Sequence, residues 1–178
     1  FDGDGDYVLV PHHSSIDFSR NEPYSISAWV FAPDSGQSSS VMEKWVAAPA
    51  APYPYVFRYN SGALSYLRYD GTDTQTLTHS PGSLSTEFVQ VAFTSDGTTM
   101  SFFSNGALVD SVAVSNSLGS ISNSDDLYIG RRGGTSARDF NGTLDNIRIY
   151  DRALSASEVS ALYNLESEPF SNQPARVV

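Results

Sequence analysis

Short segments in which apolar and polar residues alternate, separated by turn residues, run through most of this 178-residue chain. Successive side chains of a β-strand point to opposite faces, so such alternation predicts strands with one buried face. Asn105-Gly106, a pair well suited to a tight hairpin turn, lies between two of the segments. The pattern predicts an all-β fold, an antiparallel sandwich of two sheets. The predicted strands are Tyr7–Val10, Tyr24–Phe31, Tyr55–Asn60, Leu64–Tyr69, Phe88–Ser95, Met100–Ser104, Ala107–Val114, Leu127–Ile129 and Gly142–Tyr150.

One short C-terminal helix and a polar tail follow the last predicted strand. Ser155 and Glu158 have the spacing of a capping box, in which each side chain accepts a hydrogen bond from the other residue's backbone N–H. Apolar residues at helical spacing in the segment Val159–Tyr163 predict about two turns. Because residues 165–178 show no periodicity, we expect one domain over residues 1–164, followed by a linker or tail toward a following domain.

The composition excludes several classes of partner. With 20 acidic and 10 basic residues the formal net charge is −10, which repels phosphate backbones and makes nucleic acid a poor partner. No apolar run approaches the roughly 20 residues that a membrane-spanning helix needs. There is no cysteine, hence no disulfide and no thiolate metal site. The first residue is Phe1 rather than methionine, so we expect a monomeric module within a longer, multidomain polypeptide.

Several short motifs follow one another in an order that resembles a known family. They are Phe1-Asp2-Gly3 with Asp6-Tyr7-Val8, Tyr24–Val30, Val89–Gly97, Phe102–Gly106, Leu127–Arg131, Phe140–Tyr150 and Ala153–Glu158. Together they resemble the laminin-G-like (concanavalin A-like) jelly-roll domains of large bacterial surface and carbohydrate-active proteins. The resemblance covers residues 1–164.

This resemblance implies two packed, curved antiparallel sheets, with the N- and C-terminal strands side by side. It also implies an extracellular or bacterial cell-surface location. The role it implies is to hold glycans or protein partners, often with a calcium ion. The ligand itself does not follow from the fold.

The acidic opening Asp2-Gly3-Asp4-Gly5-Asp6 is a candidate calcium site. Calcium binds about six to eight oxygens, and interleaved glycines let backbone carbonyls join the carboxylates. In the family that the chain resembles, calcium often joins the first strand to the last; the matching residues here are Asp2 or Asp6, with Asp145 and Asn146. Such an ion would be chiefly structural and would stabilise the folded state. The alternative is an exposed turn whose aspartates cap N–H groups.

A second acidic pair, Asp70 and Asp73, allows the same two interpretations. It could coordinate calcium at a ligand-binding rim. The alternative is an ordinary hairpin turn, because Asp70 is followed by a glycine.

The region 45–69 carries the residue types that bind sugars, because aromatic rings stack on the CH faces of sugars and polar side chains bind hydroxyls. Prolines in its segment 45–55 predict an extended, stiff loop rather than a strand. Alternation places Tyr55 and Tyr59 on one face of their strand and Arg58 on the other, and only one of these faces can be core. The alternative is that most of the rings are core. The candidate ligand-binding residues are Trp45, Tyr53, Tyr55, Arg58, Tyr66 and Arg68, with Tyr69 nearby.

Arg131 and Arg132 form a second candidate rim site. The guanidinium fork suits a carboxylate or sulfate of an acidic polysaccharide. Adjacent residues on a strand point to opposite faces, however, so only one of them can serve a single ligand. The alternative is ion pairing with Asp125, Asp126 or Asp139.

The sequence lacks the residue patterns of hydrolases. No strand carries the closely spaced carboxylates of a glycosidase, no Gly-x-Ser-x-Gly motif is present, and the three histidines have no partner motif. The hypothesis is therefore a non-catalytic carbohydrate-binding or adhesin module of a larger extracellular bacterial protein, stabilised by calcium, whose partner is a glycan or polysaccharide. The alternative is a structural spacer, or a domain that binds a protein or peptide; burial of the rings in region 45–69 would favour it.

Overall fold

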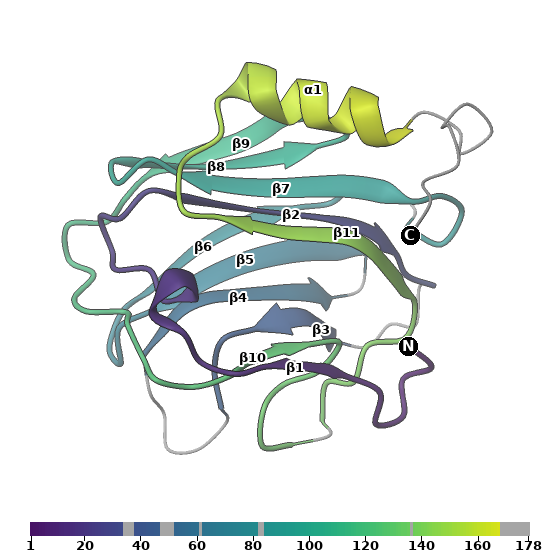
Figure 1. Ribbon diagram of the computed structural model, residues 1–178, viewed down its shortest axis with the longest axis horizontal. Coiled ribbons are helices and arrows are strands. Elements are labelled where there is room, and N and C mark those ends of the chain that lie inside the picture. Colours follow the sequence, from purple (N-terminus) through teal and green to yellow (C-terminus); the bar gives the residue numbers. More distant parts are fainter. Residues whose placement is uncertain (34–37, 47–51, 61, 82–83, 136, 168–178) are drawn as a thin grey trace, which may run out of the picture.

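Two antiparallel β-sheets stack face to face in the computed structural model, which describes residues 1–167 except 34–37, 47–51, 61, 82–83 and 136 (Figure 1). One sheet has the strand order β1-β10-β3-β4-β5-β6 and the other β11-β2-β7-β8-β9. This arrangement is the predicted all-β jelly-roll sandwich. The strands are β1 (Val8–Val10), β2 (Tyr24–Phe31), β3 (Ser38–Glu43), β4 (Tyr53–Asn60), β5 (Ala63–Tyr69), β6 (Thr74–His79), β7 (Val89–Ser95), β8 (Thr99–Ser104), β9 (Ala107–Ala113), β10 (Leu127–Ile129) and β11 (Thr143–Tyr150), with a 3₁₀ turn η1 (Ser14–Ile16).

Every strand that the alternation predicts is present, with ends within two residues of the predicted ones. Two further strands, β3 and β6, escaped the prediction. The first half of β3 is a run of serines, and β6 alternates between Thr and larger residues of which Leu77 is the one strongly apolar member. In both strands polar side chains are buried, Ser40 and Gln75 among them, so hydrophobic alternation could not reveal them.

The prediction that prolines exclude a strand as far as Tyr55 is wrong. Strand β4 begins at Tyr53 and includes Pro54. Its register against β5 shifts between Tyr53 and Val56, and such an irregularity accommodates a residue that has no N–H to donate. Residues 47–51 of the predicted loop lie outside the described residues.

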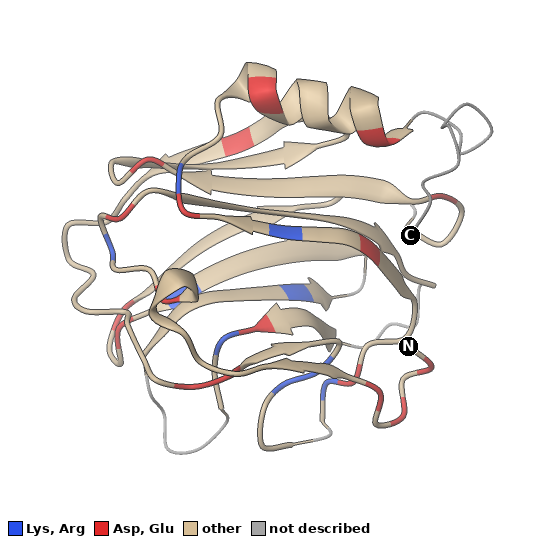
Figure 2. Cartoon of the chain, viewed as in Figure 1, with Lys and Arg blue, Asp and Glu red and all other residues tan. Residues whose placement is uncertain are grey.

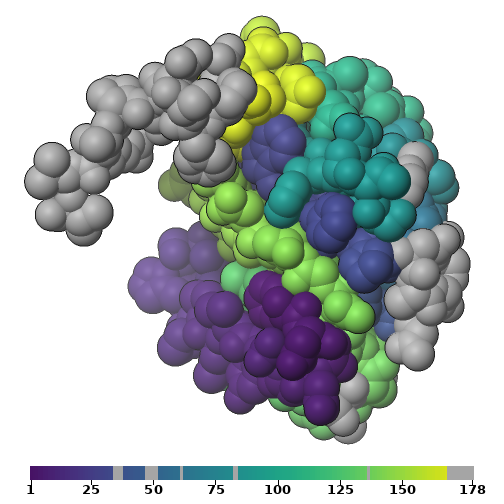
Figure 3. Space-filling model, turned by 90° about the vertical axis from the view of Figure 1, so that its right-hand side faces the viewer, coloured from purple at the N-terminus to yellow at the C-terminus, as the bar shows by residue number. Residues whose placement is uncertain are grey.

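The start of the chain lies against the segment that leads into β11 (Figure 3). Asp2 forms a bridge with Asn141, and Phe1 exchanges backbone hydrogen bonds of 3.1 and 3.0 Å with Gly142. The strands themselves do not pair, however, because β1 pairs with β10 in the six-stranded sheet while β11 belongs to the other sheet. The expectation of neighbouring terminal strands therefore holds for the first two residues and is wrong for β1.

Helix α1 (Ala156–Ser167) packs on the outer face of the five-stranded sheet (Figure 1). The ring of Trp29 from β2 stacks on Tyr163 at 5.7 Å, and its indole N–H donates to Glu166 Oε2 at 2.6 Å. Glu166 also forms an ion pair with Arg148 of β11. These contacts explain why the helix continues to Ser167, past residue 164, where the predicted helix ends. α1, the one α-helix in the described ranges, has neither the length nor the apolar character to span a bilayer.

The predicted capping box begins this helix. The backbone N–H of Ser155 donates to Glu158 Oε2 at 2.8 Å, and the N–H of Glu158 donates to Ser155 Oγ at 3.3 Å. The division between a domain of residues 1–164 and a tail of residues 165–178 stays a prediction, since residues 168–178 lie outside the described part of the chain.

Candidate functional site

The outer face of the six-stranded sheet carries a group of aromatic and charged side chains that we call the arginine–tryptophan surface. Alternation along β4 places Tyr55, Phe57 and Tyr59 in the core and leaves Arg58 on the opposite face, as predicted. Helix α1 covers the other sheet, on the far side of the molecule (Figure 1). The surface consists of Glu43, Trp45, Tyr53, Arg58, Tyr69, Arg132 and Arg138.

Glu43 lies at the centre of this surface, and its side chain is fully buried. Arg58 donates to both of its oxygens, from Nε at 2.8 Å and from Nη2 at 3.3 Å. Arg132 Nε donates to Oε2 at 3.2 Å, and the hydroxyl of Ser40 also donates to the carboxylate. Charge-assisted hydrogen bonds of this kind are about twice as strong as neutral ones. The buried carboxylate therefore holds the two guanidiniums in place.

A row of aromatic rings lies beside the arginines. The Trp45 ring is 5.3 Å from that of Tyr53, which is 5.4 Å from that of Tyr69. The guanidinium carbons of Arg132 and Arg58 lie 4.6 and 5.8 Å from the Trp45 ring centre, within range of a cation–π attraction. The indole N–H of Trp45 is buried and has no hydrogen-bond partner among the described residues. Rings, fixed guanidiniums and a donor without an acceptor thus meet on one face.

A buried ammonium group fixes the segment that carries Trp45. Lys44 Nζ donates to the carbonyl of Asp125 at 2.8 Å and to Asn123 Oδ1 at 3.0 Å, and it lies 3.1 Å from His12 Nδ1 and 4.0 Å from Asp17. Burial lowers the pKa of Lys44, and the nearby aspartates oppose this effect.

The same region connects the two ends of the loop. The side-chain amide of Asn123 donates to the carbonyls of Lys44 and Pro52, at 2.9 and 2.8 Å. The backbone N–H of Val46 donates to Asp125 Oδ2 at 3.1 Å. Residues 123–125 therefore hold the segments before and after residues 47–51, and with them the positions of Trp45 and Tyr53.

Arg131 and Arg132 point to different partners, as expected for adjacent residues. Arg131 forms an ion pair with Asp139 at 3.5 Å, one of the predicted alternatives, and lies 4.7 Å from the ring centre of Tyr7. Arg132 joins the arginine–tryptophan surface through Glu43. The two arginines therefore do not form a common ligand site.

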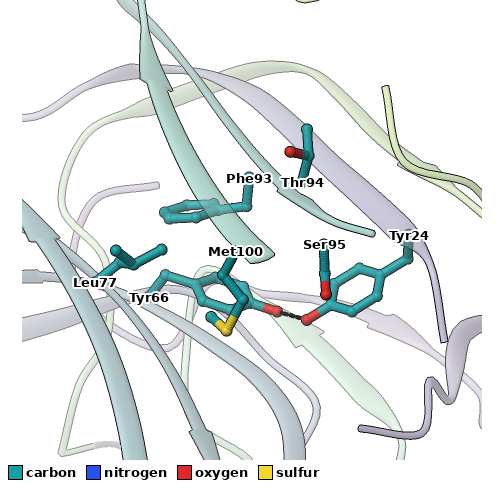
Figure 4. Close-up of a pocket in the computed structure, with 7 residues that line it drawn as sticks. All are labelled: Tyr24, Tyr66, Leu77, Phe93, Thr94, Ser95 and Met100. Atoms are coloured by element: carbon teal, nitrogen blue, oxygen red, sulfur yellow. Dashed lines mark hydrogen bonds between the residues drawn. The ribbon is translucent and has the colours of Figure 1, made fainter. Parts of the chain in front are cut away.

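Four of the predicted ligand-binding residues are buried, and this burial agrees in part with the alternative of a spacer or protein-binding domain. Tyr53 is 7% exposed but packs beside Trp45 and Tyr69. The other three lie in the core, so their prediction is wrong. Tyr55, Tyr66 and Arg68 are on the inward face of their strands, with exposed fractions of 0%, 1% and 0%. The hydroxyl of Tyr66 is hydrogen-bonded to that of Tyr24 beside a small enclosed space, and burial raises the pKa of both phenols (Figure 4). Arg68 Nη2 donates to the carbonyl of Arg20 at 2.6 Å. These side chains connect the two sheets and cannot reach a ligand.

Asp70 has the contacts of a turn cap. Its Oδ1 accepts the N–H groups of Thr72 and Asp73, each at 2.7 Å, and its Oδ2 accepts that of Gly119 at 2.6 Å. These hydrogen bonds lower the pKa of Asp70. The geometry agrees with the hairpin-turn alternative for Asp70 and Asp73 rather than with a calcium site.

The residues predicted to bind calcium at the chain ends cap backbone N–H groups, and calcium binding there stays a prediction. Asp2 Oδ1 accepts the N–H of Asp4 at 2.9 Å, and Asp6 Oδ2 accepts that of Asp2 at 3.3 Å. The carboxylate that meets this turn from elsewhere belongs to Asp139, which accepts from Gly5 N–H at 2.9 Å. In the described ranges, no group of three or more His, Cys, Asp or Glu residues could hold a metal ion.

Asp145 and Asn146 lie farther along β11. Asp145 is opposite Trp29 in the register of β11 with β2, next to an irregularity, and its Oδ1 accepts the N–H of Asn146 at 2.7 Å. Asn146 has a φ of 48°, and the side chain of Asp145 therefore supports a local bend. The contacts of all four residues match the alternative of aspartates that cap backbone N–H groups.

The fold and the face just described agree with a comparison of the whole sequence. The profile of the concanavalin A-like lectin/glucanases superfamily matches residues 2–160. The chain belongs to this superfamily. No curated protein matches it.

This lectin-like chain is also similar to solved structures of toxin binding domains. For the binding domain of Paraclostridial Mosquitocidal Protein 1 the TM-score is 0.77 at 21% identity, over 93% of this chain and 42% of that one. For the Botulinum neurotoxin serotype D binding domain the TM-score is 0.75 at 15% identity, and the match covers 93% of this chain and 41% of that one. For the binding domain of Botulinum Neurotoxin DC in complex with SialylT the TM-score is 0.71 at 15% identity, and the match covers 91% of this chain and 40% of that one. The chain thus spans less than half the length of these structures, and the likeness shows the fold alone.

Sequence reasoning found Trp45, Tyr53, Arg58 and Arg132 but missed the groups that organise them. Glu43 and Lys44 lie in a strand and a bend that carried no recognised pattern. Their signal was indirect: two adjacent residues of opposite charge directly before Trp45, in a chain where only 17% of residues are charged. Arg138 belongs to the same predicted rim loop as Arg132. Asn123 reaches the region from a more distant loop, and no local pattern reveals it.

Proposed function

We propose that this chain is a non-catalytic carbohydrate-binding module whose glycan binds at the arginine–tryptophan surface. The observation that carries the proposal is the pair of partly exposed rings of Trp45 and Tyr69, packed against the buried Tyr53 and beside two fixed guanidiniums, on a sheet face that helix α1 leaves uncovered. Aromatic faces bind the apolar side of a sugar ring, and guanidinium N–H groups donate to its hydroxyls. Membership of a lectin and glucanase superfamily supports the same function.

The same geometry favours binding over hydrolysis. A glycosidase of the usual type needs two carboxyl groups on either side of the scissile bond. At this surface Glu43 is the carboxylate that the arginines surround, and both of its oxygens accept hydrogen bonds from Arg58 or Arg132. The similar solved structures are titled binding domains, which also supports a binding role.

The proposal includes an extracellular setting as part of a larger bacterial protein. It is supported by the likeness to toxin binding domains whose chains are more than twice as long as this one. Calcium is not included, because the observed contacts of the predicted ligands are those of N–H caps. Calcium stabilisation stays a separate prediction with its own test below.

A glycan array followed by isothermal titration calorimetry tests the proposal. We expect at least one oligosaccharide on the array to bind the wild-type chain. Trp45→Ala should weaken this binding about tenfold, since one aromatic contact contributes up to about 1.5 kcal/mol. Phe88→Ala, which removes an exposed ring directly before β7 of the other sheet, is the matched control and should leave the affinity unchanged. Absence of binding to every neutral and acidic glycan on the array would overturn the proposed function.

A further inference from the structure

The arginine–tryptophan surface carries more positive charge than its own carboxylate neutralises. Arg58 and Arg132 pair with Glu43, and Arg138 lies beside them, because its backbone carbonyl accepts the N–H of Ser40 at 2.9 Å and its guanidinium donates to the hydroxyl of Ser38. Three guanidiniums thus share the neighbourhood of one carboxylate. Among the described residues, Arg138 forms no ion pair. This excess of positive charge exists in a chain whose overall net charge is −10. Figure 2 shows basic residues on β4 and on the loops beside β3 and β10, in the half of the molecule that holds the six-stranded sheet.

The three cations also repel one another. Partial burial lowers the pKa of Arg138, the charges of Arg58 and Arg132 lower it further, and only Glu43 acts in the opposite direction. Holding like charges together has a cost that a second anion would relieve. The surface is therefore organised for one more negative group than it contains.

The donors needed to bind that group are accessible. The side chains of Arg58 and Arg132 are 14% and 15% exposed, so both reach solvent next to the buried Glu43. Arg138 is likewise only partly buried. The indole N–H of Trp45 is buried and is not one of these accessible donors, but the Trp45 ring itself is only partly buried and lies next to Arg132. In the same place, Glu43 itself demonstrates that a carboxylate fits between two of these guanidiniums.

We propose that the glycan bound at this surface is acidic, with a sugar carboxylate that interacts with Arg132 and Arg138 beside the Trp45 ring. This inference rests on the proposed function and adds the class of ligand. A uronic acid and a sialic-acid-type sugar share the required chemistry, an anionic carboxylate on a pyranose ring. The negative charge of the remaining chain does not prevent binding, because charges more than about 8 Å away are largely screened at physiological ionic strength.

Two pairs of sugars that differ in charge test the proposal by calorimetry. Trigalacturonate is compared with its methyl ester, and 3′-sialyllactose with lactose. We expect the acidic member of at least one pair to bind about tenfold more tightly than the neutral member, which corresponds to roughly 1.4 kcal/mol. This preference should decline as salt is added. The pair that shows it distinguishes a uronic acid from a sialic-acid-type ligand.

Arg138→Gln is the decisive variant, because it removes a charge without leaving Glu43 unpaired. We expect the ratio of acidic to neutral affinity to fall about tenfold, since a hydrogen bond to a charged group contributes about 1.5–3 kcal/mol. Arg138→Lys, which keeps the charge but loses the fork, should retain part of the preference. Arg152→Gln is the control, because Arg152 pairs with Glu158 next to helix α1 and should change neither affinity. Thermal unfolding confirms that each variant is folded.

The outcomes separate the two proposals. Equal binding of acidic and neutral members, with glycans on the array still bound, would overturn the acidic preference and leave the proposed function intact. An acidic preference that Arg138→Gln does not reduce would overturn the assignment to this surface. Failure to bind any glycan at all would overturn the proposed function, and the inference with it.

Discussion

Replacement of Glu43 by glutamine is the most direct test of how the arginine–tryptophan surface is held together. The substitution keeps the size of the side chain and one acceptor oxygen but removes the negative charge. Glu43 is fully buried and receives hydrogen bonds from Arg58 and Arg132. Without its charge, three neighbouring guanidiniums have no counter-ion at this position. We therefore expect Glu43→Gln to destabilise the folded state.

The magnitude follows from what remains in the folded protein. Removing one partner of a buried ion pair usually costs about 3–5 kcal/mol, because the other charge is left buried and uncompensated. Here the side chains of Arg58 and Arg132 are 14% and 15% exposed, so water still hydrates part of their charge. We expect a loss near the lower end of this range, about 3 kcal/mol.

Urea unfolding followed by fluorescence measures this loss. With a urea dependence of about 2 kcal/mol per molar, the unfolding midpoint should fall by about 1.5 M while the slope stays the same. Glu87→Gln, the same change at an exposed position, is the control and should alter stability by less than about 0.5 kcal/mol. A midpoint for Glu43→Gln as high as that of the control would refute the view that Glu43 is the counter-ion of this surface. If folded, the variant should also bind an acidic glycan more tightly than the wild type does.

Three further predictions concern other parts of the fold. Burial raises the pKa of Tyr24 and Tyr66 above 10.0, so the stability that their neutral hydroxyls contribute is complete below that pH and is lost as the pH rises further. Urea unfolding from about pH 8 to about pH 11 should show this loss, and the loss should be smaller in Tyr66→Phe. Asp145→Ala should lower the melting temperature slightly and equally in calcium and in EDTA, whereas a greater loss in calcium would support the predicted ion. In Gly97→Ala the new Cβ would lie 2.4 Å from the carbonyl oxygen of Asn21 at a φ of +89°, so we expect a loss of about 2–3 kcal/mol in urea unfolding. Gly71→Ala has a similar φ and open space around it, and an equal loss there would show that backbone conformation rather than the contact is responsible.

Much of the fold was predictable because its strands obey one local rule. Where apolar residues alternate with polar ones, as in β2 and β7, the sequence predicts the strand and groups the residues that share a face, although both faces of β7 turn out to be buried. That rule fails for β3, where Ser39 and Ser40 are buried as polar residues between the larger members of neighbouring strands. The pairing of β1 with β10 could not be predicted from local alternation either, because it brings together two strands that are far apart in the sequence.

The site was predicted only in part, for a related physical reason. Alternation correctly separates Arg58 from its neighbours in β4, but it cannot state which of the two faces becomes core. On β5, the sequence offers Tyr66 and Arg68 as candidates with the same pattern, and both are inside. Arg68 is the least predictable, because its fully buried guanidinium, with two nitrogen atoms that find no hydrogen-bond partner in the described part of the chain, contradicts the usual burial preference of arginine. Composition cannot anticipate such an exception.

The backbone hydrogen bonds between Phe1 and Gly142 connect residues that are 141 positions apart in the sequence. Strand β2 likewise has β11 as one of its two neighbours, although most of the chain separates them. Contacts of such long range form late, because a large loop must close before they contribute any energy. During synthesis, one edge of β2 therefore stays unpaired until residue 150 has left the ribosome, and folding of this sandwich is expected in milliseconds to seconds rather than microseconds.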